Sequence, residues 1–501
     1  MERSGELTQI RTYGNFRRPT TAGLLGLGSW GTGVLLAGLI LVVLVVMIAG
    51  LLWGAIAFTA LAVVLASVAV RDEHGSSLLD RASAKITYQL AAQRGLTLYR
   101  SGPLGTVPWG TCQLPGLAAC LRLSEHLDAY GRPFALISAP STATHTVVIA
   151  SEPDGAALVD QPQIDSWVAD WGQWLTNLGD EPGIEAAAVT IETAPDSGHR
   201  LAHEVGGAID PNAPAFARAM LTEIVEAYPV GSSTIHAWVT ITFTAANSSG
   251  KKRTPEQVGR DLAARLPGLM STLGSTGAGA TRLVDAAELC EIVRVAYDPQ
   301  TADLIAGAHA DNEPVDLDWT DVGPAAHQAG WDVYRHDSAC SVTWQMSSAP
   351  RGNVQSSVLA RLLAPHPDIA RKRVTLLYRP INSAVAAAMV EADVRAASFR
   401  ATSTERPTAR SILDTRSAEA TAAEEAAGAG LVNFGALITA TVTDPARLPE
   451  ARAAVDMLSA TARLRVRPCY GSQDAAFAAG LPLGILLPQL VSSITAFKDK
   501  L

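Results

Sequence analysis

No charged residue occurs between Arg18 and Arg71. The hydrocarbon core of a bilayer is about 30 Å thick, and one helix needs ~20 apolar residues to cross it. The uncharged residues 19–70 are therefore long enough for two crossings. Only helices and closed barrels satisfy every backbone polar group in lipid. We expect a transmembrane helical hairpin over 29–71, with spans of roughly 29–49 and 53–71 joined near Gly50.

Basic residues flank this stretch on both sides. Arg17 and Arg18 precede it and Arg71 follows it, so the positive-inside rule predicts that both ends lie in the cytoplasm. Trp30 and Trp53 stand where interfacial anchors are expected. The stretch is too long and begins too late for a signal peptide, and a secretory arrangement with an external body is the less favoured alternative. The expected location is the plasma membrane, with two helices.

The rest of the chain alternates between strand-like and helical segments. Residues Ser76–Leu96 predict an amphipathic helix near the membrane. From His145 onward, strand–helix–strand units recur, with a clear strand at Ile235–Thr244 followed by a helix at Pro255–Leu273. This pattern predicts an α+β fold built from ferredoxin-like units, with a sheet on one side and helices on the other.

The expected organisation has five parts. They are a cytoplasmic segment 1–28, the hairpin 29–71, a juxtamembrane helix with a Gly/Pro-rich region 72–143, a first α+β domain 144–335, and a second α+β domain 336–501 with a helical insertion 384–427 that is broken near Pro407.

Composition excludes several classes of protein. The five cysteines are scattered and none forms a C-x-x-C pair, which argues against a disulfide framework and a structural zinc site. The net charge of −9 gives no basic character for direct nucleic-acid binding. The short basic run Lys251–Arg253 is more typical of a solvated loop than of a binding patch.

No motif for catalysis stands out. Gly250–Lys251 lacks the other residues of a phosphate-binding loop. His199 and His203 lie four apart on an expected helix, but a solvated face is favoured over a metal site. His336, Asp337 and Ser338 are triad residue types, yet sequence neighbours do not make a triad. We therefore predict no catalytic, cofactor-binding or metal-binding residue, and no enzyme. A membrane-anchored enzyme with an unrecognised active site is the alternative.

Two apolar segments could form a partner surface or a core. The first is the helix face with Trp167, Trp171 and Trp174, for which core packing is favoured. The second is the C-terminal tail, which is either a buried element or a docking element. Its candidate surface residues are Gln473, Phe477, Leu481 and Pro482.

The order of these parts resembles known secretion proteins. The segments Tyr13–Pro19, Arg100–Gly105 and Ala129–Ile137, with the hairpin, resemble EccE, an actinobacterial membrane subunit of type VII secretion. The paired-helix N-terminus is similar to the PrgI-type subunit of type IV secretion. Leu283–Pro299 and Gln473–Gly484 are similar to the N-terminal domain of the conjugation ATPase, here without its motor.

This resemblance implies a non-catalytic subunit of a type IV-like or type VII-like secretion or conjugation machine. Its expected partners are the lipid bilayer, other membrane proteins of the apparatus and a separate P-loop ATPase, within an oligomeric complex. No ionisable residue lies within 19–70, which disfavours a small-molecule transporter.

Overall fold

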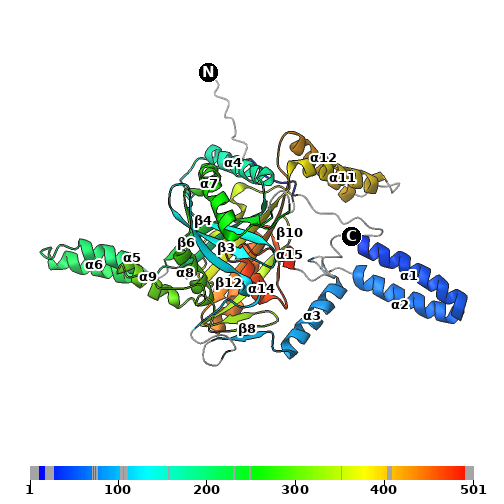
Figure 1. The fold of residues 1–501 in the computed structure, drawn as a ribbon, viewed down its shortest axis with the longest axis horizontal. Coiled ribbons are helices and arrows are strands. Elements are labelled where there is room, and N and C mark those ends of the chain that lie inside the picture. Colours follow the sequence, from blue (N-terminus) through cyan, green and yellow to red (C-terminus); the bar gives the residue numbers. More distant parts are fainter. Residues whose placement is uncertain are drawn as a thin grey trace, which may run out of the picture.

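The computed structural model describes residues 11–16, 28–69, 72, 74, 77–101, 105, 111–155, 158–228, 232–246, 250–350, 352–402 and 409–490. The predicted α+β class is confirmed, because helices surround one large antiparallel sheet (Figure 1). Helices also project from this body on opposite sides.

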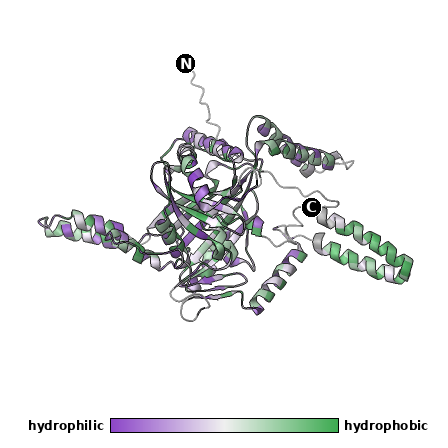
Figure 2. Cartoon of the chain, in the orientation of Figure 1, coloured by the Kyte–Doolittle hydropathy of each residue, from purple (hydrophilic) through white to green (hydrophobic). Residues whose placement is uncertain are grey.

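Two apolar helices, α1 (Gly28–Ala49) and α2 (Leu51–Ala69), form a hairpin at the N-terminal end. They are the most hydrophobic elements of the chain (Figure 2). Gly50, at φ 88°, makes the turn between them. A Cβ on Gly54 would lie 2.1 Å from the Val46 side chain, so the two helices pack closely there because this residue is small.

One helix in the described part of the chain is long and apolar enough to cross a membrane, with its most apolar window at Thr32–Ala49. The 22 residues of α1 rise ~33 Å, which matches the thickness of a bilayer core. The apolar part of α2, Leu51–Ser67, is shorter.

The sheet contains strands from almost the whole body. Its order is β1-β8-β9-β10-β12-β11-β5-β6-β4-β3-β2, with β13 paired to β10 and β7 paired to β4. The strands are β1 (Leu98–Arg100), β2 (Arg122–Leu127), β3 (Pro133–Ala139), β4 (Thr144–Glu152), β5 (Ile184–Pro195), β6 (Ser233–Thr244), β7 (Ala280–Leu283), β8 (Ala326–Ala329), β9 (Tyr334–His336), β10 (Ala339–Ser348), β11 (Arg371–Pro380), β12 (Val432–Val442) and β13 (Arg465–Pro468).

Two halves of this sheet share one topology. The first half has the order β7-β4-β6-β5 and the second has β13-β10-β12-β11, so the fourth, first, third and second strands are neighbours in each. Both halves pair antiparallel throughout. They meet where β5 pairs with β11, with Val189 opposite Leu376. The two predicted strand–helix–strand stretches therefore join edge to edge in one sheet.

One face of the sheet is covered by helices that follow the strands. In the first half, α4 (Gln161–Asp180) and α7 (Pro255–Leu273) bury apolar side chains against β4 and β6. In the second half, α10 (Ala360–Leu363) and α13 (Leu448–Thr461) do the same against β10 and β12. The bounds predicted for α7 from sequence are those observed.

The opposite face carries paired hydroxyl groups at equivalent places in the two halves. Thr146 bonds Thr242 at 3.0 Å, and Thr343 bonds Thr439 at 3.0 Å. This face is covered by α8 (Ala286–Tyr297), α14 (Gln473–Ala479) and the residues that follow α14. Gly484, at φ 65°, crosses the first half so closely that a Cβ would lie 2.1 Å from Thr146 Oγ1.

Each half inserts a pair of helices between its second and third strands. In the first half the pair is α5 (His199–Ala208) and α6 (Ala215–Ala227). In the second it is α11 (Ser383–Thr402) and α12 (Ala409–Ala426). Pro211 lies between α5 and α6, whereas Pro407, where the sequence predicts a break in the second pair, lies outside the described residues.

Three further helices complete the fold. The predicted amphipathic helix is observed as α3 (Leu78–Gln93), with a Ser77–Asp80 capping box. Helix α9 (Thr301–Ala310) packs beside α5 and was not predicted. Helix α15 (Leu487–Leu490) ends the described chain.

Candidate membrane anchor and interaction surfaces

Residues 11–16, which we call the N-terminal strap, bind a part of the body that lies far away in the sequence. Tyr13 N donates to Val354 O at 2.8 Å, and Val354 N donates back to Tyr13 O at 2.7 Å. The Tyr13 hydroxyl donates to Asp165 Oδ1 at 2.9 Å. Partial burial and this bond to a carboxylate raise the pKa of Tyr13. The strap thus makes an isolated antiparallel bridge to Val354 and is also held through the Tyr13 side chain.

The strap continues onto the second inserted helix pair. Asn15, in the left-handed region at φ 59°, bonds Ser417 and Thr421 of α12 through its amide. The rings of Phe16 and Phe434 lie 5.5 Å apart, between the strap and β12. Because the strap precedes α1 and the body follows α2, the chain on both sides of the apolar hairpin meets in one place.

A cavity of about 380 Å³ lies beneath the strap. Its walls are mainly apolar and come from the strap, β11, β12, α12 and the segment around Leu359. Tyr378 lines it, and burial raises the pKa of that phenol to about 12. This cavity suits an apolar group, and its α12 wall also carries Glu424 and Glu425.

The predicted membrane-anchor residues are partly within the described chain. Trp53 lies in the first turn of α2 at the closed end of the hairpin, with 59 % of its surface exposed. Trp30 lies in the first turn of α1. Arg17, Arg18 and Arg71, predicted to set the topology, fall outside the described residues.

The tryptophan face of α4 belongs to the core. Trp174 is buried, and Trp171 stacks on it at 4.9 Å while meeting the Tyr378 ring edge-on. The Trp167 ring packs on Gly277, where a Cβ would lie 2.7 Å from it. Of the two interpretations left open by the sequence, core packing is therefore the one observed.

The C-terminal candidates are likewise buried, which corrects their interpretation as a partner surface. The Gln473 side-chain amide bonds the Thr343 backbone as a neighbouring strand would. It accepts from Thr343 N at 2.8 Å and donates to Thr343 O at 3.2 Å. Phe477 is fully buried and packs on the rings of Tyr297 and Tyr334. Leu481 and Pro482 are buried beside it. These residues close the sheet face, so of the two alternatives left open by the sequence the buried element is the one observed.

A buried ion cluster lies where the two halves join. Glu192 on β5 bonds Arg371 and Arg373 of β11, the latter from Nε at 2.7 Å. Burial alone would raise the pKa of Glu192, but the two arginines outweigh it and lower the pKa to about 2. The Arg373 guanidinium also lies over the Phe477 ring at 5.6 Å. The cluster fixes the register of the joint.

The sequence neighbours His336, Asp337 and Ser338 point to different partners. His336 bonds Tyr297 O and Ser341 Oγ, and burial lowers its pKa to about 4. Asp337 pairs with Arg294 at 3.4 Å, and Ser338 donates to Asp298 at 2.6 Å. No triad forms among these three, and each side chain serves the packing of α8 on the sheet.

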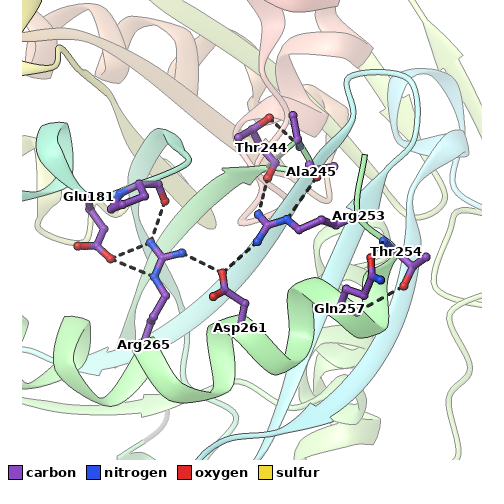
Figure 3. Close-up of polar contacts among 10 residues, drawn as sticks. Glu181, Thr244, Ala245, Arg253, Thr254, Gln257, Asp261 and Arg265 are labelled. Carbon is purple, nitrogen blue, oxygen red and sulfur yellow. Dashed lines mark hydrogen bonds and ion pairs between the residues drawn. The ribbon is translucent and has the colours of Figure 1, made fainter. Parts of the chain in front are cut away.

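Arg253 of the predicted basic run is structural. Figure 3 shows its guanidinium reaching the Thr244 and Ala245 carbonyls and Asp261, at 3.1 Å from the last. Arg265 joins the same carboxylate and also Glu181, at 2.7 Å. This network ties the end of β6 to α4 and α7.

No metal site emerges in the described part of the chain, where no group of three His, Cys, Asp or Glu residues could hold an ion. His199 and His203 lie on α5 with no third ligand from the described residues.

Sequence reasoning missed the exposure of the inserted helices. Helix α6 buries none of its residues, and Phe216 is 76 % exposed. Met220 and Ile224 follow it at intervals of four, so they make one apolar stripe in solvent. The spacing was visible in sequence, but only the fold shows that nothing in the described chain covers this stripe.

Comparison with protein families matches residues 20–80 to a domain of unknown function, DUF8461. The match covers the two apolar helices and the start of α3. No curated protein matches the chain.

Proposed function

We propose that the chain is a non-catalytic membrane subunit of a type IV-like or type VII-like secretion or conjugation machine. It holds a separate cytoplasmic P-loop ATPase at the plasma membrane. Helices α1 and α2 cross the membrane as a two-span hairpin, and both termini lie in the cytoplasm. The body needs no nucleic-acid contact for this role.

The contact between the strap and the body carries this proposal. Residues Arg11–Phe16 precede the hairpin and bind Val354 and α12, which follow it. Two segments that touch each other lie on one side of a membrane, so an even number of crossings separates them. Because α1 is long enough for one span, we assign the returning span to α2. The apolar part of α2 is shorter than that of α1, and the bilayer can thin locally to match it.

The body supports a scaffolding role. Its two ferredoxin-like halves form one continuous sheet. A buried ion cluster joins the halves, and the buried C-terminal segment covers one face. From this platform α5 and α6 project away from the hairpin (Figure 1). The exposed stripe of Phe216, Met220 and Ile224 is the surface that we assign to the ATPase.

Affinity purification of the tagged full-length protein from its native host tests this function. In mild detergent it should bring down a P-loop ATPase, and the double variant Phe216→Asp/Met220→Asp should lose that ATPase while staying in the membrane. The matched control is Met457→Asp, an exposed apolar position on α13 that belongs to neither inserted pair. A stable membrane protein that recovers no ATPase at native expression would contradict the proposal.

A further inference from the structure

We propose that the tip of the α11–α12 pair, together with α3, is a second membrane contact that binds the anionic lipid surface. This inference rests on the proposed membrane anchoring and goes beyond it, because it assigns the orientation of the body. The body would then lie against the bilayer through three separate elements instead of hanging from the hairpin alone.

The first support is position. In Figure 1, α11 and α12 project from the body toward the side on which α1 and α2 leave it, whereas α5 and α6 project to the opposite side. Helix α3 runs across the direction of α1 and α2, as a helix lying in the plane of the membrane would. Two elements distant in sequence thus face the side of the body that the hairpin places against lipid.

The second support is charge. The described tip half of the α11–α12 pair, residues 395–402 and 409–416, contains four arginines and one acidic residue. The base half, residues 384–394 and 417–427, contains five acidic residues and no Lys or Arg. A positive tip on a negative base matches an anionic lipid surface, which attracts basic residues close to it.

The third support is exposed apolar surface beside these charges. Phe399, next to Arg400, is 72 % exposed, and Ile412 and Leu413 are exposed on the facing turn of α12. Apolar side chains flanked by arginines are typical of elements that insert at the headgroup boundary. The buried residues of α11, Ala386, Val390 and Ala397, lie on its other face.

Helix α3 presents the same combination. Ile86 and Leu90 are exposed, with Lys85 beside them. The helix is held to the body through Tyr88, whose ring meets Trp331 edge-on and whose hydroxyl donates to Ala329 O at 3.3 Å. This attachment leaves the apolar side chains of α3 free to meet lipid.

The first inserted pair is the contrast that favours lipid over protein at the α11–α12 tip. Residues 199–228 contain two arginines, no lysine and four acidic residues. An acidic arm directed away from the hairpin is unsuited to an anionic surface, although it also exposes a phenylalanine, Phe216.

Site-specific fluorescence in nanodiscs tests the inference on the full-length protein. The background is Cys112→Ser/Cys120→Ser, which removes the two cysteines that are not buried. A polarity-sensitive dye is placed at Phe399→Cys, Ile86→Cys, Trp53→Cys or Phe216→Cys, one at a time. The nanodiscs contain phosphatidylglycerol with a shallow spin-labelled quencher lipid, or phosphatidylcholine with the same quencher.

The inference predicts quenching at residues 399 and 86 in phosphatidylglycerol, weaker quenching in phosphatidylcholine and none at residue 216. Arg395→Gln/Arg400→Gln/Arg416→Gln should remove the difference between the lipids at residue 399. If the dye at residue 53 reports insertion while residue 399 stays unquenched in both lipids, the inference is overturned and the anchor stands. If residue 53 itself reports no lipid, the proposed anchoring fails first.

Discussion

The two inserted helix pairs occupy the same place in two halves of one sheet, yet they differ in what they touch. The α11–α12 pair receives the N-terminal strap through Asn15 and buries Ala386 and Val390 against Leu431. The α5–α6 pair buries no residue on the body and is accompanied by α9 alone. In our proposal, the inserted pair faces the membrane in one half and points away from it in the other.

The repeated sheet is thus the constant part of the fold, and the two inserted helix pairs differ in what they contact. The joint between β5 and β11 makes the halves one mechanical unit.

Breaking the joint should have the largest effect. Glu192→Gln leaves Arg371 and Arg373 buried without a carboxylate, which costs about 3–5 kcal/mol in comparable buried pairs. Denaturant unfolding of the purified protein should show both halves losing stability in one transition. Glu419→Gln, an exposed position on α12, is the control and should change stability by less than about 0.5 kcal/mol. Two separate transitions would contradict a shared joint.

One buried imidazole–hydroxyl pair lies beside each half of the sheet. His336 on β9 bonds Ser341 on β10, and His145 on β4 bonds Ser138 on β3. Burial lowers both pKa values, that of His336 to about 4. Below pH 6.5, the usual histidine pKa of about 6.5 means that these imidazoles are protonated in the unfolded chain, whereas in the folded chain they stay neutral. The free energy of unfolding therefore falls as the pH drops from 6.5 to 4.

For His336 this loss amounts to ~3 kcal/mol at pH 4, and it is absent above pH 6.5. His336→Gln should flatten the pH dependence of the unfolding free energy more than His145→Gln does, because His336 lies deeper. Unfolding curves at pH 7, 5.5 and 4.5 measure the slopes. Equal slopes in both variants and the parent protein would refute this account of the buried imidazoles.

The strap should show a smaller effect. Tyr13→Phe removes the hydroxyl that bonds Asp165 in a partly exposed setting and should cost about 1 kcal/mol. Hydrogen exchange should report faster opening around Val354 in that variant. The control is Tyr130→Phe, an exposed tyrosine on the turn before β3. Unchanged protection at Val354 would mean that the strap is not held through this bond.

Substitutions on α6 should have the smallest effect on stability. Phe216→Asp exposes no core, so the unfolding free energy should change by less than about 0.5 kcal/mol while ATPase recovery falls. Thermal unfolding and quantitative co-purification measure the two quantities. A large loss of stability would indicate that α6 packs on the body after all.

Local structure was largely predictable from sequence. The Thr254–Gln257 capping box and the spaced apolar residues define α7, and the alternation in Ile235–Thr244 defines β6. The joint between β5 and β11 was not predictable, because both strands carry partners on either side and sequence periodicity does not choose among them. The burial of Phe477 depends on Tyr297 and Tyr334, which lie more than 140 residues earlier.

The most direct test of the account is the sidedness of the two segments that flank the hairpin. One epitope is placed before residue 11 and another after residue 490 of the full-length protein. Protease accessibility is then compared in inverted and right-side-out membrane vesicles. The account predicts that both epitopes are cleaved in inverted vesicles and both are protected in right-side-out vesicles. Cleavage of one epitope from each side would contradict the two-span anchor and the function proposed on it.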